Sequence, residues 1–470
     1  FVCCGLNSIG IGSGGGVGKV TAEWMMTGHI NEDIFSYDIK RFQKFHSELG
    51  FIKPRITETL GDLYGMHWPF KQHKTSRNIK TLPHHDNLKS FGACFGVSAG
   101  YERPMWFALD GEKSEYEYSY NYQNWYPSAE YETNNTLKNV GLFDLTPFSK
   151  FEIKSDKAHQ ELQKICTANI KNEIGKCTYT HMLNSDGGIE TDLTVVCLDK
   201  DHFRIISSAA TRERDKFHIN KHLSKDVELK DVTDDYCVFG LFGPKSRDLI
   251  KSISKDNFDN DNFKFGRAKN ITINGIEIWA QRLSYVGELG YELYVKFDDA
   301  KKIYELLIEK GKDFNLSNCG MHAMDIMRME SGFLHWGHDI SPEENQYQAG
   351  LSFTISSKTK DEFIGKKALE KIKKEKIKSR FAMFTLKNSK PGEPLLLHDE
   401  PIYLDEKIIG RSTSGNYSFN FKKNLTFGYI NNDFSNEELQ NKNLFIEVEK
   451  KKYPISIQSE PLKRTDFKNL

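Results

Sequence analysis

The chain has 470 residues, and at roughly 150 residues per domain this length predicts about three domains. Lys plus Arg and Asp plus Glu both number 65, so the formal net charge is zero, which argues against a general binder of nucleic acid or acidic membranes. The composition, 38% hydrophobic and 12% aromatic, can fill several cores. No apolar run reaches the roughly 18 residues of a membrane span. A soluble multidomain protein is therefore expected.

The chain opens on FVCCGLNSIGIGSGGGVGK, followed by the helical pattern VTAEWMMTGH. It has no initial Met and no charged segment before the apolar run, so we expect the tail of a larger domain whose front, with any targeting signal, is missing. Gly10, Gly12 and Gly15 satisfy GxGxxG, but the second strand with an acidic end that a dinucleotide site needs does not follow. The pattern predicts a strand, a glycine loop and a helix. Spacing alone leaves open whether the loop approaches a ligand or is a tight turn without one.

Two segments between this opening and residue 140 are rich in histidine or tyrosine. His84-His85-Asp86 has no third metal ligand at a usual spacing, and it predicts a solvated turn after Pro83. Residues 115–131 carry six tyrosines and one tryptophan, and the alternating YEYSYNY predicts a strand. We favour packing at a seam between domains over a stacking surface for a planar ligand.

The eight cysteines are spread over the chain and none forms a CxxC pair. This spacing gives no support to a zinc or thioredoxin-type site, and it favours reduced, mostly buried thiols in a reducing compartment. We predict no metal site.

From Val140 onward the sequence alternates predicted strands and helices. Strands are predicted on both sides of Pro147, on both sides of a turn at Gly187-Gly188, and in HFRIISSA. Helices are predicted in KSRDLIKSI, AKKIYELLIEKGKDF and HAMDIMRMESGFLHW, the last stopped by Gly332. This pattern indicates an α+β domain. A lysine-rich helix over 366–378 marks a boundary, and the short strands beyond it predict a small antiparallel barrel.

Three carboxylates stand in apolar strand patterns. Asp192 lies in TDLTVV, and Glu288 and Glu292 lie in SYVGELGYELYV. A carboxylate inside a strand is costly unless it is paired, capped or catalytic. It can also accept two N–H bonds from the amidine-like edge of a pterin or guanine ring. The residues alone therefore give a candidate cleft, and a structural ion pair is the favoured alternative at each position.

Six ordered blocks carry a family resemblance from residue 140 to the end of the chain: VGLFDLTPFSKFEI, GGIETDLTV, LFGPKSRDLI, LSYVGELGYELYV, GMHAMDIMRMESGFLHWGHDI and FIGKKAL. They resemble the aminomethyltransferase family, which includes the T-protein of the glycine cleavage system and the folate-binding halves of sarcosine and dimethylglycine dehydrogenases. GYERPMWF and the glycine-rich opening are similar to the dehydrogenase branch, whose FAD domain ends in a strand, loop and helix of this kind.

The resemblance implies an α+β multidomain fold in four parts. These are the tail of an FAD-dependent oxidoreductase domain (1–43), a connector domain (44–110), an aminomethyltransferase-like folate-binding domain (111–367) and a C-terminal antiparallel β-barrel (368–470).

It also implies residues of a folate site. The functional aspartate of the family falls on Asp192 and its pterin-contacting glutamate falls on Glu292, with backbone contacts near Tyr179 and Ile206. Three positions depart from the T-protein pattern. The arginine associated with the folate tail falls on Met324, a tyrosine of the folate-facing strand on Arg204 and a glutamate on Gln348. Arg204 is the candidate to replace the lost cation. In the FAD tail, the residues expected near the isoalloxazine ring are Ser8, Gly10, Ile11 and Gly12.

The function that this resemblance implies is the C-terminal part of an FAD-dependent N-methyl amine dehydrogenase, for sarcosine or dimethylglycine, that passes the one-carbon unit to tetrahydrofolate. FAD would be held only together with the missing N-terminal domain. Two alternatives stay open: a stand-alone aminomethyltransferase, and a non-catalytic regulatory subunit like that of pyruvate dehydrogenase phosphatase.

The expected partners are a small methylated amine and folate, with no nucleic acid and no membrane. The electron acceptor, either an electron-transfer flavoprotein or oxygen, stays open. The expected location is the cytoplasm of a bacterium or the mitochondrial matrix of a eukaryote.

Overall fold

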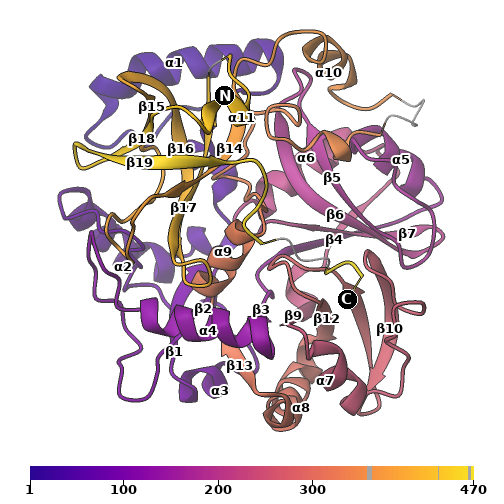
Figure 1. The fold of residues 1–470 in the computed structure, drawn as a ribbon. Helices are drawn as coiled ribbons and strands as arrows, with labels where there is room; N and C mark the ends of the chain where they lie inside the picture. Colours follow the sequence, from indigo (N-terminus) through magenta and orange to yellow (C-terminus); the bar gives the residue numbers. More distant parts are fainter. Residues whose placement is uncertain (357–361, 432, 464–466, 470) are drawn as a thin grey trace.

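A computed structural model describes residues 1–356, 362–431, 433–463 and 467–469. Figure 1 shows a β-barrel at the upper left and two sheets on the right, with α1 across the top and α2 at the left. Across the described ranges, no helix is both long and apolar enough to cross a membrane.

Two sheets form the centre of the α+β region and confirm the strands predicted from Val140 on. The six-stranded sheet has the order β10 (Arg267–Ile273), β11 (Ile276–Arg282), β12 (Gly290–Lys296), β9 (Tyr236–Phe242), β3 (Val140–Asp144) and β13 (Leu316–Cys319). The five-stranded sheet has the order β5 (Cys177–Leu183), β6 (Ile189–Asp199), β7 (His202–Ser207), β4 (Ser149–Lys154) and β8 (Leu229–Asp231). β3 and β4 follow one another in the chain but lie in different sheets, because the turn at Pro147 carries the chain across.

Helices cover the outer faces of both sheets, and the three predicted helices are confirmed. The helices of this region are α4 (Tyr126–Lys138), α5 (Ala158–Ile165), α6 (Arg212–His222), α7 (Ser246–Ile253), α8 (Ala300–Gly311) and α9 (Met321–Glu330). α7 and α8 share a hydrophobic core with the six-stranded sheet around Phe239, and α5 and α6 share one with the five-stranded sheet around Ile205. The inner faces then meet, since Ile206 of β7 packs in the same cluster as Trp279 of β11.

The predicted C-terminal barrel is confirmed as a closed, antiparallel barrel. Its strands in order are β14 (Arg380–Leu386), β17 (Lys423–Ile430), β16 (Lys407–Ser418), β15 (Pro401–Leu404), β18 (Leu444–Val448) and β19 (Lys451–Gln458). The lysine-rich segment before it contains α10 (Lys366–Ile372), and the short helix α11 (Asn436–Leu439) lies between β17 and β18. Alternating apolar side chains such as Phe384, Ile402 and Ile446 fill the barrel.

A buried ion pair joins the α+β region to the barrel. Arg328 of α9 donates to Asp339 at 2.5 Å and to Asp325 at 2.8 Å. Its second guanidinium nitrogen donates to Ser414 of β16 at 2.9 Å, and Asp339 also accepts from the hydroxyl of Thr413 at 2.6 Å. A buried guanidinium is tolerated only when its donors are paired in this way. The network therefore fixes the position of α9 against the barrel.

The first 110 residues form α1 (Gly10–Thr27), α2 (Leu49–Leu63), α3 (His85–Ser90) and a hairpin of β1 (Ala93–Ser98) and β2 (Tyr101–Phe107). The strand and glycine loop predicted for the opening are wrong. Residues 1–6 belong to no sheet of the described chain, and α1 begins at Gly10, so the glycines lie in its first turns. Without a neighbouring strand, the backbone N–H and carbonyl groups are satisfied within the helix.

The solvated turn predicted at His84-His85-Asp86 is also wrong. His84 is buried, and its ring stacks on Tyr304 of α8 with 4.4 Å between the ring centres. Burial lowers the pKa of His84 to about 3, so the ring is neutral and packs as an aromatic side chain.

The tyrosine-rich segment forms a loop and the start of α4 where a strand was predicted. Its hydroxyls reach α9 and the loop between α2 and α3: Tyr116 bonds to His322 of α9, Tyr118 accepts from the N–H of Gln72, and Tyr120 donates to the carbonyl of His67. Packing at a seam between domains, by contrast, is what the structure shows. Trp125 stacks on His322 at 3.7 Å, and Tyr126 meets Phe419 of the barrel region at 5.7 Å between ring centres.

We expect chymotrypsin to cut the folded chain after Tyr37 and Tyr64 well before it cuts after Trp125. The two tyrosines are 74% and 81% exposed and Trp125 is 1% exposed. A protease needs a locally unfolded segment, which the packing at Trp125 prevents. A time course followed by mass spectrometry of the fragments checks this. Early cleavage after Trp125 would mean that residues 115–131 are a loose linker.

Candidate functional site

The predicted folate residues lie on two sheets whose inner faces meet: Tyr179 on β5, Asp192 on β6, Arg204 and Ile206 on β7, and Glu292 on β12. In the five-stranded sheet, Thr194 stands opposite both Tyr179 and Ile206, and Asp192 stands opposite His181. Opposed residues of an antiparallel pair point to the same face. The structure therefore brings Tyr179, Asp192 and Ile206 together on the inner face.

Asp192 is a nearly buried carboxylate without a cationic partner. Its side chain is 19% exposed, and the nearest basic atom is Nε2 of His181 at 3.7 Å. Burial lowers the pKa of His181 to about 3, so that ring carries no charge to balance the carboxylate. Oδ1 of Asp192 is buried and has no hydrogen-bond partner in the described chain. Burial raises the pKa of Asp192 to about 7, with the hydroxyl of Tyr179 opposing the rise. The structural ion pair considered from the sequence is absent here among the described residues.

Glu292 is a second carboxylate of the same kind. The hydroxyl of Tyr294 donates to it at 3.0 Å, and burial raises its pKa to about 7. In the register of the sheet, Glu292 stands opposite Gln281 and Tyr294 stands opposite Trp279. Within the described chain, the amide of Gln281 and the indole N–H of Trp279 are buried without hydrogen-bond partners. This face of the six-stranded sheet therefore offers a carboxylate without a cationic partner in the described chain, together with an amide and an indole N–H that have no hydrogen-bond partner there.

Sequence reasoning missed Gln281 and Trp279. The signal was present in IEIWAQR, where a glutamine ends an apolar strand, but only the register with Glu292 shows that these side chains share a face.

At Glu288 the structure shows the structural ion pair that the sequence analysis favoured over a binding role. Glu288 forms a buried ion pair with Lys463 at 2.5 Å. Glu288 therefore has a cationic partner and Glu292, four residues later, has none in the described chain. Of the two, Glu292 is the carboxylate available to a ligand.

Arg204, the candidate to replace the cation missing at Met324, is already paired within the protein. It is buried, bonds to Glu152 at 2.6 Å and lies over the ring of Tyr236 at 4.5 Å. Although burial raises the pKa of Glu152, hydrogen bonds from His202 and the pairing with Arg204 bring it down to about 2. The charge of Arg204 is therefore already balanced, and Nη1 is its atom without a partner in the described residues.

The other two departures from the T-protein pattern have structural roles. Met324 is buried in a cluster with Phe143 and Val286. The side chain of Gln348 accepts from the amide of Asn345 at 2.5 Å.

The predicted FAD residues are not brought to this site. Ser8 precedes α1, and Gly10, Ile11 and Gly12 lie in its first turn, with Ile11 fully exposed. A side chain built at Gly12 would meet nothing within 4 Å, so packing among the described residues does not require glycine there. α1 runs across the top of Figure 1, whereas β5 to β7 lie at the right.

One group in the described chain has the geometry of a metal site: Glu58, Asp62 and His73 place ligand atoms within 4.8 Å of one another. Its two carboxylates already have partners within the protein. Glu58 accepts from the N–H groups of Lys74 and Thr75, and Asp62 pairs with Lys71 at 2.5 Å.

Three sequence families match the chain in order. Residues 27–81 match the FAD dependent oxidoreductase central domain, residues 84–359 match the GCVT N-terminal domain, and residues 380–463 match the glycine cleavage T-protein C-terminal barrel domain.

Several curated proteins are similar over most of the chain. The 4-methylaminobutanoate oxidase (formaldehyde-forming) of Paenarthrobacter nicotinovorans is 37% identical over 89% of this chain and 50% of its own length. The mitochondrial dimethylglycine dehydrogenase of Rattus norvegicus is 30% identical over 98% of this chain and 53% of its own length. The mitochondrial pyruvate dehydrogenase phosphatase regulatory subunit of Mus musculus is 30% identical over 92% of this chain and 50% of its own length. The chain thus spans about half the length of these relatives.

A solved structure has the same fold. The crystal structure of the glycine cleavage system aminomethyltransferase T from Bartonella henselae matches with a TM-score of 0.69, covering 82% of this chain and 98% of that one at 22% identity. This match and the closed barrel confirm the predicted fold class.

We expect Asp192→Asn to raise the free energy of unfolding at pH 8 and to leave it nearly unchanged at pH 4. The folded pKa, raised to about 7, lies above the ordinary value of about 4 in the unfolded chain, so the ionised group costs stability increasingly as the pH rises from 4 through 7. Asparagine avoids this cost, worth on the order of 1–4 kcal/mol. Urea unfolding at both pH values measures it. Asp201→Asn, on the exposed turn between β6 and β7, is the control. A loss of stability at pH 8 would show that Asp192 has a structural partner.

Proposed function

Since the chain belongs to the family of the GCVT N-terminal domain and its T-protein barrel, with the central domain of FAD-dependent oxidoreductases before them, we propose that it binds tetrahydrofolate between its two sheets. There it would transfer to folate the one-carbon unit of an N-methyl amine such as dimethylglycine or sarcosine. We also propose the division into parts at about residues 43, 110 and 367.

The observation that carries the proposal is the set of unsatisfied polar groups on the two inner faces. Asp192 and Glu292 are partly buried carboxylates without a cationic partner among the described residues, and the amide of Gln281 and the indole N–H of Trp279 are buried there without hydrogen-bond partners. Unpaired buried groups cost stability, so a scaffold role does not account for them. These groups match the edge of a pterin ring, whose N–H donors can bond to the carboxylates and whose carbonyl can accept from the indole N–H or the amide.

In the proposed reaction this chain would accept a proton from the folate and exclude water from the site. A flavin held by an amine-oxidising domain would supply the oxidation of the N-methyl amine. Asp192, with a pKa raised to about 7, is suited to accept the proton that the folate nitrogen loses when it takes the one-carbon unit. Its negative charge would also stabilise the cationic carbon in a site of low dielectric constant. Glu292 would hold the pterin in place, and the enclosing sheets would keep the reactive cation from water.

The glycine-rich first turns of α1 support a flavin-side role for the N-terminal segment. Ile11 is fully exposed, and Gly12 and Gly14–Gly16 leave open space beside the helix. We propose that Ser8, Gly10, Ile11 and Gly12 face the flavin or its domain in the whole protein.

The two alternatives make different demands on this chain. A stand-alone aminomethyltransferase does not explain the match of residues 27–81 to the FAD-dependent oxidoreductases. A regulatory subunit does not explain why Asp192 and Glu292 are kept as unpaired buried carboxylates. The curated relatives of the dehydrogenase type are bacterial and mitochondrial, and we propose the cytoplasm or the mitochondrial matrix accordingly.

We expect the 470-residue chain to bind tetrahydrofolate stoichiometrically in anaerobic titration calorimetry. Glu292→Gln should weaken binding about tenfold or more, because it removes a charged acceptor from a buried hydrogen bond. Glu288→Gln is the matched control, since its carboxylate lies on the same segment and is taken up by Lys463. Equal affinities for the parent and Glu292→Gln would contradict the proposed site.

In the enzyme that joins this chain to an amine-oxidising flavin domain, we expect Asp192→Asn to uncouple the two reactions. The amine should still reduce the flavin, and the one-carbon unit should leave as formaldehyde, because loss of the base slows transfer by about 10²–10⁴-fold. The measurement is methylene-folate formed per flavin reduced, with the melting temperature taken beside it. An unchanged yield would remove Asp192 from the mechanism.

A further inference from the structure

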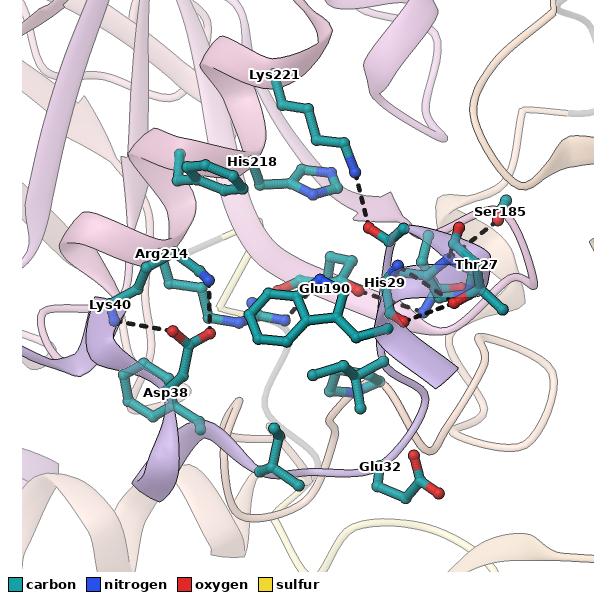
Figure 2. A pocket seen from close by; sticks show the side chains of 18 of the residues that line it. Thr27, His29, Glu32, Asp38, Lys40, Ser185, Glu190, Arg214, His218 and Lys221 are labelled. Carbon is teal, nitrogen blue, oxygen red and sulfur yellow. Dashed lines mark hydrogen bonds and ion pairs between the residues drawn. The ribbon is translucent and has the colours of Figure 1, made fainter. Parts of the chain in front are cut away.

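A cavity lies between the segment of residues 27–40 and α6 (Figure 2). Its volume is about 300 Å³, and Asn184 and Ser185 of the turn between β5 and β6 close another side. Asp192 and Glu292 do not line it. A volume of about 300 Å³ is at the lower end of the range for small-molecule sites.

α6 turns a basic edge toward this cavity. Lys221 donates to the carbonyl of Gly28 at 2.9 Å, and no carboxylate of the described chain pairs with its charge. His218 is nine-tenths buried and lines the cavity, and its Nε2 has no hydrogen-bond partner in the described residues. A buried ring nitrogen without a partner costs free energy unless a ligand satisfies it. In Figure 2, His218 and Lys221 both extend from α6 over the opening.

The other charged groups around the cavity, apart from Asp33, have partners of their own. The pairs are Lys40 with Asp38 at 2.8 Å, Arg214 with Glu190, Glu32 with Lys19 at 3.3 Å and His29 with Asp186 at 3.0 Å. Asp33 is exposed to solvent and accepts the N–H of Phe35. Lys221 is thus a positive charge that the described carboxylates leave unbalanced.

Lys221 is the group at this end of α6 that would attract an anion. Burial lowers the pKa of His218 and of His222, and the nearby charge of Lys221 lowers both further. Both rings are therefore neutral at physiological pH and offer N–H donors beside the ammonium group.

The remaining wall is apolar. It consists of Trp24, Ile30, Ile34, Phe35, Phe217 and Trp336. Arg214 lies over the ring of Trp336 at 4.5 Å, and Lys40 lies over Trp24 at 4.6 Å and over Phe217 at 4.9 Å. These contacts hold the rings in fixed orientations, so the wall is preformed.

We propose that this cavity binds a small organic carboxylate with an apolar body, whose carboxylate is held by Lys221 and His218 while the aromatic wall holds the body. The site is separate from the folate site and does not depend on it. Its walls come from two matched families, since residues 27–40 belong to the oxidoreductase central domain and α6 to the GCVT domain. An occupant would therefore bridge the two units.

Titration calorimetry of the 470-residue chain with phenylacetate tests the proposal. Two further probes separate the contributions of the ligand: phenethylamine has a similar body with the opposite charge, and acetate has the charge without the body. We expect phenylacetate to bind one to one and at least about tenfold more tightly than either, as one charged hydrogen bond predicts. Quenching of tryptophan fluorescence, through Trp24 and Trp336, gives a second readout.

Variants of α6 then locate the site. Lys221→Met should weaken phenylacetate binding about tenfold, and Lys221→Arg, which keeps the charge and the donors, should restore most of it. Lys216→Met is the matched control, because this lysine lies on the same helix and does not line the cavity. Tetrahydrofolate binding should be the same in all three variants, so failure here is distinct from failure of the folate site.

Three results would overturn the proposal. These are no binding of phenylacetate, equal binding of phenethylamine, and an unchanged affinity in Lys221→Met when its melting temperature equals that of the parent.

Discussion

The buried pairing of Arg328 with Asp339 is the contact on which the relative positions of the other parts depend. Loss of either partner would leave a buried charge unbalanced, at a cost of about 3–5 kcal/mol, so both residues hold one arrangement. Arg328 fixes α9 to the barrel through Ser414, and Asp339 also accepts the backbone N–H of His335. The next residue, Trp336, donates to the carbonyl of Ile189, where β6 begins. The same hydrogen-bond network therefore fixes the relative positions of the barrel, the strand that carries Asp192, and Trp336 in the wall of the cavity at α6.

Charge pairing distinguishes the candidate carboxylates from their neighbours in the same strands. Glu288 and Glu190 lie in or near the same strands as the candidate residues, and each has a basic partner, Lys463 or Arg214. Asp192 and Glu292 have a neutral histidine and a tyrosine hydroxyl instead. Each carboxylate without a cationic partner carries a free-energy cost when it ionises, and under the proposed function a bound folate would recover that cost at Asp192 and Glu292.

How far the sequence predicts the structure depends on where each element finds its hydrogen bonds and neighbours. The strands from Val140 on and the barrel were predictable because alternation reflects burial of one face. Asp192 and Glu292 were predictable because carboxylates are rare in apolar strands. The strand expected at the N-terminus has no neighbour in the described chain, and local sequence cannot show that. The burial of His84 against Tyr304 and the pairing of Arg204 with Glu152 depend on residues far apart in the chain. Strand register, which local patterns do not contain, places Arg204 opposite Glu152 and Gln281 opposite Glu292.

The position of β3 has a consequence for how the chain is made. β3 is the first strand of the six-stranded sheet to leave the ribosome, yet its neighbours β9 and β13 are synthesised far later, β13 as the last strand of the sheet. Until β9 is made this apolar strand has two unpaired edges, and until β13 is made it has one, a state that is open to association with other chains. Translation must therefore run through Cys319 before the oldest strand of the sheet is covered on both sides. A ribosome that stalls earlier leaves a nascent chain for chaperones to hold.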